Sequence, residues 1–239
     1  MKVELYIPCF INEMFPRIGF DMIKTLEKAD VEVNYNPEQT CCGQPFYNSG
    51  YWKHSEKMAE KFLTDFSGNV PIIVPSASCA GFIKNHYSKI FENKPDMLQG
   101  LSKVTKNVIE YTDFLVNHIK MTSFGAEFPY KVTYHDGCSA LRDYGIKEEP
   151  RILLSNVKNL ELVEMEETDT CCGFGGTFMV KFPAVSVAMA EQKLEHAINT
   201  GADYIVSSEA SCFINLNSVI EKRKLPIKTA HIASVLASF

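Results

Sequence analysis

Residues Gln39–Gly50 read QTCCGQPFYNSG, and residues Asp169–Val180 read DTCCGFGGTFMV. Both stretches place two adjacent cysteines directly before a glycine. Adjacent side chains on an extended strand point to opposite faces, so two neighbouring sulfurs reach one site only where the backbone turns sharply. Gly43 and Gly173 are predicted to make that turn, because glycine adopts a positive φ without steric cost.

The remaining cysteines extend this repeat over the whole chain. All eight fall into two sets of the same order, and the second set follows the first at an offset of about 130 positions. This self-similarity indicates an internal duplication, and no cysteine is left outside it. The sets are Cys9, Cys41, Cys42 and Cys79 in the first half and Cys138, Cys171, Cys172 and Cys212 in the second.

Strand-like and helix-like segments alternate in both halves. A short run rich in β-branched and aromatic residues precedes each cysteine position, as VELYIP precedes Cys9 and VEVNYN precedes Cys41. These patterns predict an α/β fold of two tandem duplicated cysteine-rich halves, 1–124 and 125–239, each a mostly parallel sheet flanked by helices. Apolar residues recur at helical spacing over 17–29, 55–66, 184–201 and 215–224.

The cysteines are expected at one edge of each sheet. In parallel α/β sheets ligands gather at the carboxyl ends of the strands, and every cysteine position follows a predicted strand by a few residues. If helices begin just after Cys9, Cys79 and Cys212, their N-terminal amides help to hold the thiolates deprotonated.

Composition restricts the class of protein and its compartment. The chain has 239 residues, a net charge of -5 and no long basic run, which argues against a nucleic-acid surface. We find no signal-peptide pattern and no apolar stretch long enough for a transmembrane segment. We therefore expect a cytoplasmic protein, or one held at a membrane through partners. Thiols stay reduced in that compartment, so metal binding or redox chemistry is favoured over disulfides.

A set of four thiolates suits a tetrahedral centre, either zinc or an iron–sulfur cluster. For one cysteine taken alone, burial as a small apolar side chain is the more common role. For a duplicated set of eight, that interpretation is less favoured. Thiol–disulfide exchange is a further alternative, although no CxxC motif is present and a bridge between adjacent cysteines is strained.

Three other groups of residues are weaker candidates. His135 and Asp136 stand just before Cys138, where they either tune a metal centre and relay protons or cap the strand end. No catalytic residue is assigned beyond these two. His231 is predicted to be a core histidine with satisfied hydrogen bonds rather than a ligand. The aromatic residues Tyr47, Tyr51 and Trp52 form either a docking patch or part of the core, and core packing is favoured.

The segments QTCCGQP, PSASCAG, CCGFGGTF and HIASVL resemble the cysteine-rich CCG proteins, and within them the iron–sulfur oxidoreductases of lactate utilisation. The resemblance covers nearly the whole chain. It implies a subunit of a redox complex that oxidises L-lactate to pyruvate, with one [4Fe-4S] cluster in each half and the eight cysteines as ligands. More distant relatives are the iron–sulfur subunits of glycolate oxidase and the CCG-containing subunit of heterodisulfide reductase.

The sequence departs from the fullest CCG pattern. Heterodisulfide reductase ends each motif with CxxC, whereas here Ser76 precedes Cys79 by three positions and Glu209 precedes Cys212 by three. If the single cysteine instead matches the first of that pair, Phe82 and Asn215 stand at the replaced positions. Four thiols per half disfavour a noncubane cluster and direct disulfide reduction, and zinc is an alternative metal in the second half. Two other functions therefore stay open, a zinc-stabilised interaction module and a heterodisulfide-type thiol–disulfide reductase subunit.

The resemblance also implies partners. Related subunits carry an N-terminal ferredoxin segment with closely spaced cysteines, and this sequence has none. We therefore expect a separate ferredoxin-like iron–sulfur partner and a further lactate-utilisation subunit. No residue of this chain suits hydride or proton abstraction from a 2-hydroxy acid, so the lactate site is expected on a partner.

Overall fold

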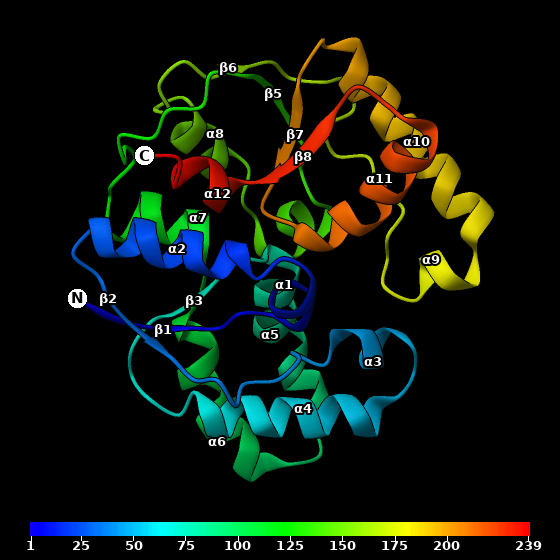
Figure 1. The fold of residues 1–239 in the computed structure, drawn as a ribbon. Helices are drawn as coiled ribbons and strands as arrows, with labels where there is room; N and C mark the ends of the chain where they lie inside the picture. Colours follow the sequence, from blue (N-terminus) through cyan, green and yellow to red (C-terminus); the bar gives the residue numbers. More distant parts are fainter.

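The computed structural model describes all 239 residues and contains two four-stranded sheets. The strand orders are β2-β1-β3-β4 and β6-β5-β7-β8, and every pairing is parallel (Figure 1). The same order in both sheets confirms the predicted α/β fold of two duplicated halves. The first sheet lies within residues 2–110 and the second within 131–231, and the expected boundary after residue 124 stays a prediction.

The sequence predicted six of the eight strands. The two that it missed, β4 and β8, are the last strand of each sheet; β4 has only three residues, and KTAH in β8 lacks an apolar alternation. The strands are β1 (Lys2–Leu5), β2 (Glu32–Tyr35), β3 (Ile72–Val74), β4 (Val108–Glu110), β5 (Lys131–Tyr134), β6 (Glu161–Leu162), β7 (Tyr204–Ser207) and β8 (Lys228–His231).

Helices connect successive strands, as parallel pairing requires. The four predicted helices are confirmed as α2 (Arg17–Lys28), α4 (Trp52–Asp65), α10 (Pro183–Asn199) and α11 (Ala210–Arg223), the last beginning five residues earlier than expected. Helices α1 (Cys9–Met14) and α5 (Ala77–Ile90) lie where the sequence raised helix starts near Cys9 and Cys79. The helices not predicted are α3 (Gln44–Asn48), α6 (Pro95–Asn107), α7 (Tyr111–Asp113), α8 (Glu148–Leu154), α9 (Phe178–Lys181), α12 (Ile232–Leu236) and π-helical turns at Phe114–His118 and Ala140–Tyr144.

The first sheet is covered on both faces. Along β3, Ile72 and Val74 belong to one buried cluster with residues of α4, α5 and α6, whereas Ile73 belongs to another with α2. This alternation is the period of two that side chains follow along a strand. Figure 1 accordingly shows α2 on one side of β1 and α4 on the other.

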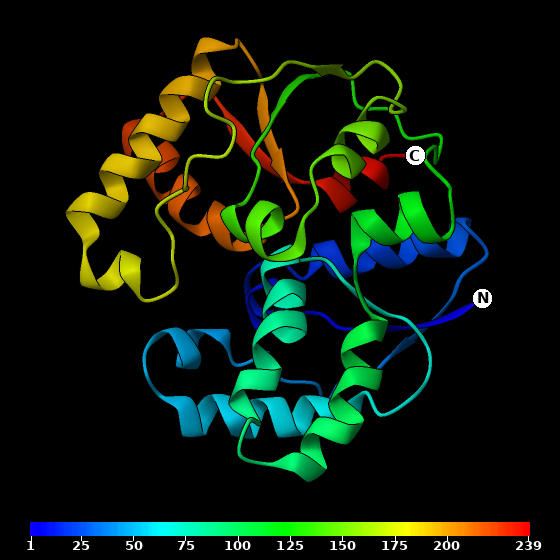
Figure 2. The ribbon, with the colours of Figure 1, turned by 180° about the vertical axis from the view of Figure 1, so that it is seen from behind.

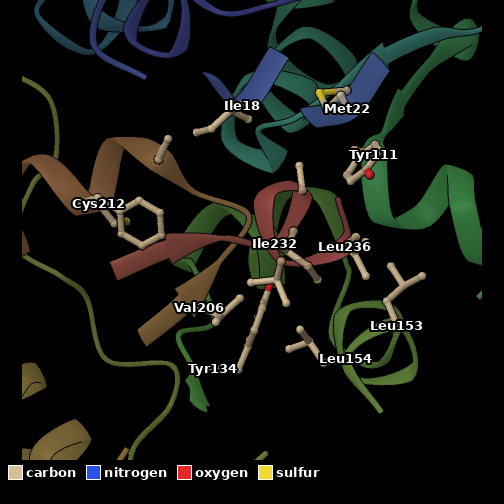
Figure 3. Packing of buried hydrophobic residues seen from close by; sticks show 14 of the residues in the cluster. Ile18, Met22, Tyr111, Tyr134, Leu153, Leu154, Val206, Cys212, Ile232 and Leu236 are labelled. Carbon is tan, nitrogen blue, oxygen red and sulfur yellow. The ribbon is translucent and has the colours of Figure 1, made fainter. Parts of the chain in front are cut away.

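The two halves share their largest hydrophobic core. Ile18 and Met22 of α2 lie beside Ile232 and Leu236 of α12, at the opposite end of the chain (Figure 3). Burial of this apolar surface favours a fixed arrangement of the halves. Both termini lie on one side of the molecule, and α3 and α9 lie on the other, in Figure 1 and in the reverse view of Figure 2. No helix has the length and apolarity needed to cross a membrane.

Candidate metal centre

The structure brings the four thiols of each half into contact. In the first half the Cys42 and Cys79 sulfurs are 3.5 Å apart, and Cys41 is hydrogen-bonded to both Cys9 and Cys42. The second half repeats this chain of contacts in the order Cys138, Cys171, Cys172, Cys212. All eight cysteines are free thiols. Each set follows the carboxyl ends of three neighbouring strands, as the sequence predicted.

The predicted glycine turns are confirmed. Gly43 has φ of 91° and Gly173 has φ of 79°, and each amide donates a hydrogen bond of 3.4 Å to the sulfur of the first cysteine of its pair. A Cβ at Gly43 would lie 2.9 Å from the Ser55 Oγ atom, and a Cβ at Gly173 would lie 2.9 Å from the Asn215 Nδ2 atom. Only glycine therefore allows both the turn and the close packing behind it.

The expected helix starts need a correction. Helix α1 begins at Cys9 itself, whereas α5 and α11 begin two residues before Cys79 and Cys212 rather than just after them. The strand ends turn into helix at once, so these two cysteines occupy the first helical turn. Amides in the first turn have no carbonyl partner within the helix, which makes this position favourable for negative charge.

Both sets of thiols line one cavity of about 230 Å³ between the halves. The sequence predicted a site in each half and gave no sign that the two sites face each other. The carboxyl ends of both sheets open on this space, because the duplicated halves pack with these edges together. The sides of the cavity include Pro45 and Asn48 of α3 from the first half and Gly175 and Thr177 from the second.

The first set of thiols is arranged to hold negative charge. Hydrogen bonds from Cys42 and Cys9 lower the pKa of Cys41 to about 3, and donation to Cys41 raises the pKa of both donors. These hydrogen bonds therefore favour a single thiolate, that of Cys41, with its neighbouring thiols protonated. A bound cation is what allows several adjacent thiols to lose their protons together. In each half four thiols linked in a chain of neighbours, with an amide donor, are the kind of donor set that binds zinc or an iron–sulfur cluster, and His135, Cys172 and Cys212 place three ligand atoms mutually within 4.8 Å.

His135 and Asp136 have different environments. His135 is fully buried, and one of its ring nitrogens lies within 4.8 Å of the sulfurs of Cys172 and Cys212. Burial, together with the nearby positive charge of Lys193, lowers the pKa of His135 to about 3, so the ring is neutral. Asp136 is instead held by Arg151 through two hydrogen bonds of 2.9 and 2.8 Å. Only His135 faces the thiols.

Sequence analysis missed the residues that support the cysteine pairs from behind. Tyr87 of α5 donates a hydrogen bond of 2.9 Å to the Cys42 carbonyl, and Asn215 of α11 donates one of 2.8 Å to the Cys172 carbonyl. Asn215 stands three positions after Cys212, a spacing that could have indicated its role. Nothing in the local pattern around Tyr87 distinguishes it from other core aromatics.

A buried carboxylate also joins the halves at the cavity. Glu209 accepts hydrogen bonds from the Ser78 amide at 2.6 Å, the Ser78 hydroxyl at 2.8 Å and the Ser76 hydroxyl at 3.2 Å. Burial raises the pKa of Glu209 to about 7. Ser76 and Glu209 occupy the same position in the two repeats, three residues before the last cysteine, and meet across the interface.

Comparison with known proteins places this arrangement in a family. The CCG family of cysteine-rich domains matches residues 3–84 and 132–217, one match in each half. The chain belongs to the CCG family.

Relatives of this CCG protein match along its whole length. Lactate utilization protein A 1 of Bacillus mycoides is 38% identical over 236 residues, 99% of this chain and 96% of that protein. Lactate utilization protein A of Geobacillus thermodenitrificans is 37% identical over 236 residues, 99% and 98% of the two chains. A crystal structure of a hypothetical protein from Helicobacter pylori shares the fold, with a TM-score of 0.61 and 12% identity over 97% of this chain and 47% of that one.

The CCG protein exposes apolar side chains within a few positions of the cavity residues Asn48 and Thr177. Trp52 is 67% exposed and Tyr51 is exposed as well, so the prediction that they pack in the core is wrong for both. Tyr47 instead packs on a buried phenylalanine. Val180 and Phe182 are exposed at the corresponding place in the second half. We call these four residues, with the exposed Lys53, Lys57 and Lys181, the rim surface. Hydroxyls of Ser49 and Thr177, 3.3 Å apart, join its two parts.

His231 is a core histidine, as predicted. Its Nε2 atom lies 3.1 Å from the Pro75 carbonyl of the first half and 3.2 Å from the Ser208 carbonyl of the second. The Nδ1 atom accepts a hydrogen bond of 3.2 Å from the Ala233 amide and so caps α12. Both ring nitrogens have partners, and the ring joins the halves away from the thiols.

Proposed function

We propose that this CCG protein is an electron-transfer subunit of a complex that oxidises L-lactate to pyruvate. One [4Fe-4S] cluster would bind in each half, to Cys9, Cys41, Cys42 and Cys79 and to Cys138, Cys171, Cys172 and Cys212. When bound, two such clusters would carry one electron each, which matches the two electrons released when a 2-hydroxy acid becomes a 2-keto acid. The substrate is inferred from the names of the two lactate-utilization relatives.

The observation that carries this proposal is the common cavity of the two thiol sets. All eight thiols line one space between the halves, which favours transfer between two centres over two isolated structural sites. Amide donors at Cys41 and Cys171, and the first-turn positions of Cys79 and Cys212, supply the hydrogen bonds and dipoles that tune cluster potentials.

The rim surface supports a partner that carries the lactate chemistry. It combines exposed apolar side chains with three lysines, and the acidic residues Glu56 and Glu60 of α4 are paired with Lys94. The chain as a whole has a net charge of -5, so this basic apolar area differs from the rest of the molecule. We propose that an acidic ferredoxin-like iron–sulfur subunit docks here, with a further lactate-utilisation subunit completing the complex.

Zinc in the second half is the second candidate, and His135 favours it. Structural zinc sites commonly combine cysteine and histidine, whereas cubane clusters usually bind thiolates alone. A zinc ion in the second half would leave the first half as the only electron carrier.

The deciding experiment measures iron, acid-labile sulfide and zinc per chain on protein purified under strict anaerobiosis. Two clusters predict about eight iron and about eight sulfide per chain. Half of these amounts of iron and sulfide, together with one zinc ion per chain, would indicate one electron carrier and one structural site. Zinc alone, in colourless protein, would overturn the electron-transfer proposal and favour an interaction module stabilised by metal.

A further inference from the structure

The two repeats place different residues at one equivalent position behind the thiols. Tyr6 precedes Cys9 by three positions, and His135 precedes Cys138 by three. Tyr6 donates its hydroxyl to the Thr40 carbonyl at 3.0 Å and so satisfies its polar atom within the first half. His135 is equally buried, yet neither of its ring nitrogens has a partner in hydrogen-bonding geometry, and the nearby Thr168 carbonyl already accepts from Lys193 and from the Asp136 amide.

The groups around His135 are already engaged. Lys193 donates to the Glu167 carbonyl at 2.7 Å and to the Thr168 carbonyl at 3.0 Å. Asp136 is paired with Arg151. Burying a polar ring without a partner costs about 1–3 kcal/mol, and native proteins rarely leave such groups unpaired. The protein itself therefore leaves this imidazole available for something bound.

The position of the ring is fixed by its own backbone. The His135 amide donates to the Val206 carbonyl at 2.8 Å, and the His135 carbonyl accepts from the Ser207 hydroxyl at 2.9 Å. These bonds extend the pairing of β5 with β7 by one residue. The ring is thereby held toward Cys172 and Cys212, with a nitrogen and two sulfurs mutually within 4.8 Å.

We infer that a ring nitrogen of His135 is a metal ligand in the second half, beside Cys172 and Cys212. The second half then offers five donors, four thiols and one imidazole, whereas the first half offers thiols alone. This inference rests on the proposed function only in requiring a metal in the second half, and it holds for iron or for zinc.

A histidine ligand makes the two centres chemically different. A neutral nitrogen donor carries less negative charge than a thiolate, and histidine ligation raises the reduction potential of iron–sulfur centres. If both halves hold clusters, the second centre is expected to have the higher potential. Electrons would then pass from the first half to the second across the common cavity.

The test uses the full chain, labelled with 15N-histidine, purified anaerobically and reduced for pulsed electron paramagnetic resonance. We expect nitrogen modulation from a directly bound histidine in the wild type and its loss in His135→Gln. The matched control is His86→Gln, because His86 also has a buried ring nitrogen without a partner but lies on α5 of the first half. Modulation that persists in His135→Gln, or is absent from iron-loaded wild type, would overturn the inference.

Two further variants keep the test decisive. His135→Cys restores a donor, so it should keep the metal, lose the nitrogen signal and lower the potential of the second centre. His135→Tyr copies the first half, and the metal of its second half should exchange into a chelator at least about tenfold faster than in wild type. Equal exchange rates in His135→Tyr and wild type would contradict ligation.

A cobalt titration separates this inference from the electron-transfer proposal. If the purified protein contains zinc and no iron, electron transfer fails while His135 ligation can still be measured. Cobalt(II) bound to the metal-free wild type should then show a visible spectrum that shifts in His135→Gln and not in His86→Gln. Identical spectra for the wild type and both variants would overturn the inference alone.

Discussion

The two halves of this CCG protein share a backbone and differ in what surrounds their thiols. Behind the first set, Tyr6 packs edge-on against Phe62 and Phe66, with ring centroids 5.0 and 5.6 Å apart. Behind the second set lie His135, Asn215 and the buried Lys193. The duplicated strand order and glycine turns are kept in both, whereas the surrounding shell is aromatic in one half and polar in the other.

This difference separates two physical requirements. The position of the thiols depends on strand ends and on a backbone turn, and these are the same in both repeats. The potential of a bound centre depends on the dielectric and the hydrogen bonds around it, and these can change without moving the thiols. An apolar shell disfavours added negative charge, so the first centre is expected to have the lower potential.

The largest expected effect comes from removing one thiol in either half. Cys42→Ser leaves three donors in the first half and should remove the metal of that half alone, so iron per chain should fall from about eight to about four. Cys172→Ser leaves three thiols and His135 in the second half, so the metal there should be lost completely only when His135→Gln is added. The measurement is iron and sulfide on anaerobic protein. Full iron content in Cys42→Ser, or in Cys172→Ser combined with His135→Gln, would show that the cysteine is not a ligand.

The glycine turns provide the second comparison. Gly173→Ala should destabilise the protein by about 4 kcal/mol, since it combines a strained φ with a clash against the Ser186 backbone carbonyl, the nearest atom, and against the Asn215 side chain. Gly43→Ala should cost less, because the nearest atom is a serine hydroxyl that can rotate away. Urea unfolding measures both changes.

Open glycines serve as controls for these two variants. Gly50 and Gly145 also have a positive φ, but no atom lies within 4 Å of a Cβ added there. Gly50→Ala and Gly145→Ala should therefore cost only about 1 kcal/mol, the strain of the backbone alone. Losses as large as that of Gly173→Ala would show that packing behind the cysteines is not the cause.

The residues that cap α7 and α12 should contribute to the stability of the fold with opposite dependences on pH. Glu110 caps α7, and burial raises its pKa to about 8; His231 caps α12, and burial lowers its pKa to about 4. Glu110 takes up a proton on folding, so its contribution to stability is lost as pH rises from about 4.5 to 8. His231 releases a proton on folding, so its contribution is lost as pH falls from about 6.5 to 4.

Substitutions of these capping residues isolate the two pH dependences of stability. Glu110→Gln should flatten the loss toward alkaline pH, and His231→Gln should flatten the loss toward acid, each by on the order of 3 kcal/mol. Charged neighbours, Glu209 for Glu110 and Asp21 for His231, are unchanged in these variants. Urea midpoints between pH 4 and 9 test this, and parallel curves for a variant and wild type would contradict its assigned cap.

The smallest expected effects concern the residues that hold the cysteine carbonyls. Tyr87→Phe leaves the Cys42 carbonyl without a donor, which should cost about 1–3 kcal/mol. Asn215→Leu removes two hydrogen bonds, one to the Cys172 carbonyl and one to the Ser186 carbonyl inside α10, and should cost more. Urea unfolding of the two variants measures both losses of stability. A larger loss for Tyr87→Phe would mean that the polar shell of the second half is less dependent on its hydrogen bonds than we infer.

The sequence by itself determined the local framework of this protein. Runs such as VELYIP and KVTY predicted strands because their side chains suit a pleated buried surface, and CCG predicted the turn because it depends on one residue. Both signals lie within a few positions of each cysteine. The duplicated sheets and the grouping of cysteines at strand ends followed from them.

Only the tertiary structure decided how the repeats meet. The common cavity, the fourth strand of each sheet and the free ring of His135 depend on residues distant in sequence. Glu209, for example, holds the Ser78 amide across 131 positions. Trp52 is exposed for the same kind of reason, because burial depends on which surfaces the folded halves cover. Contacts of this kind leave no periodic signal in the chain, since they arise only after both halves have folded and packed.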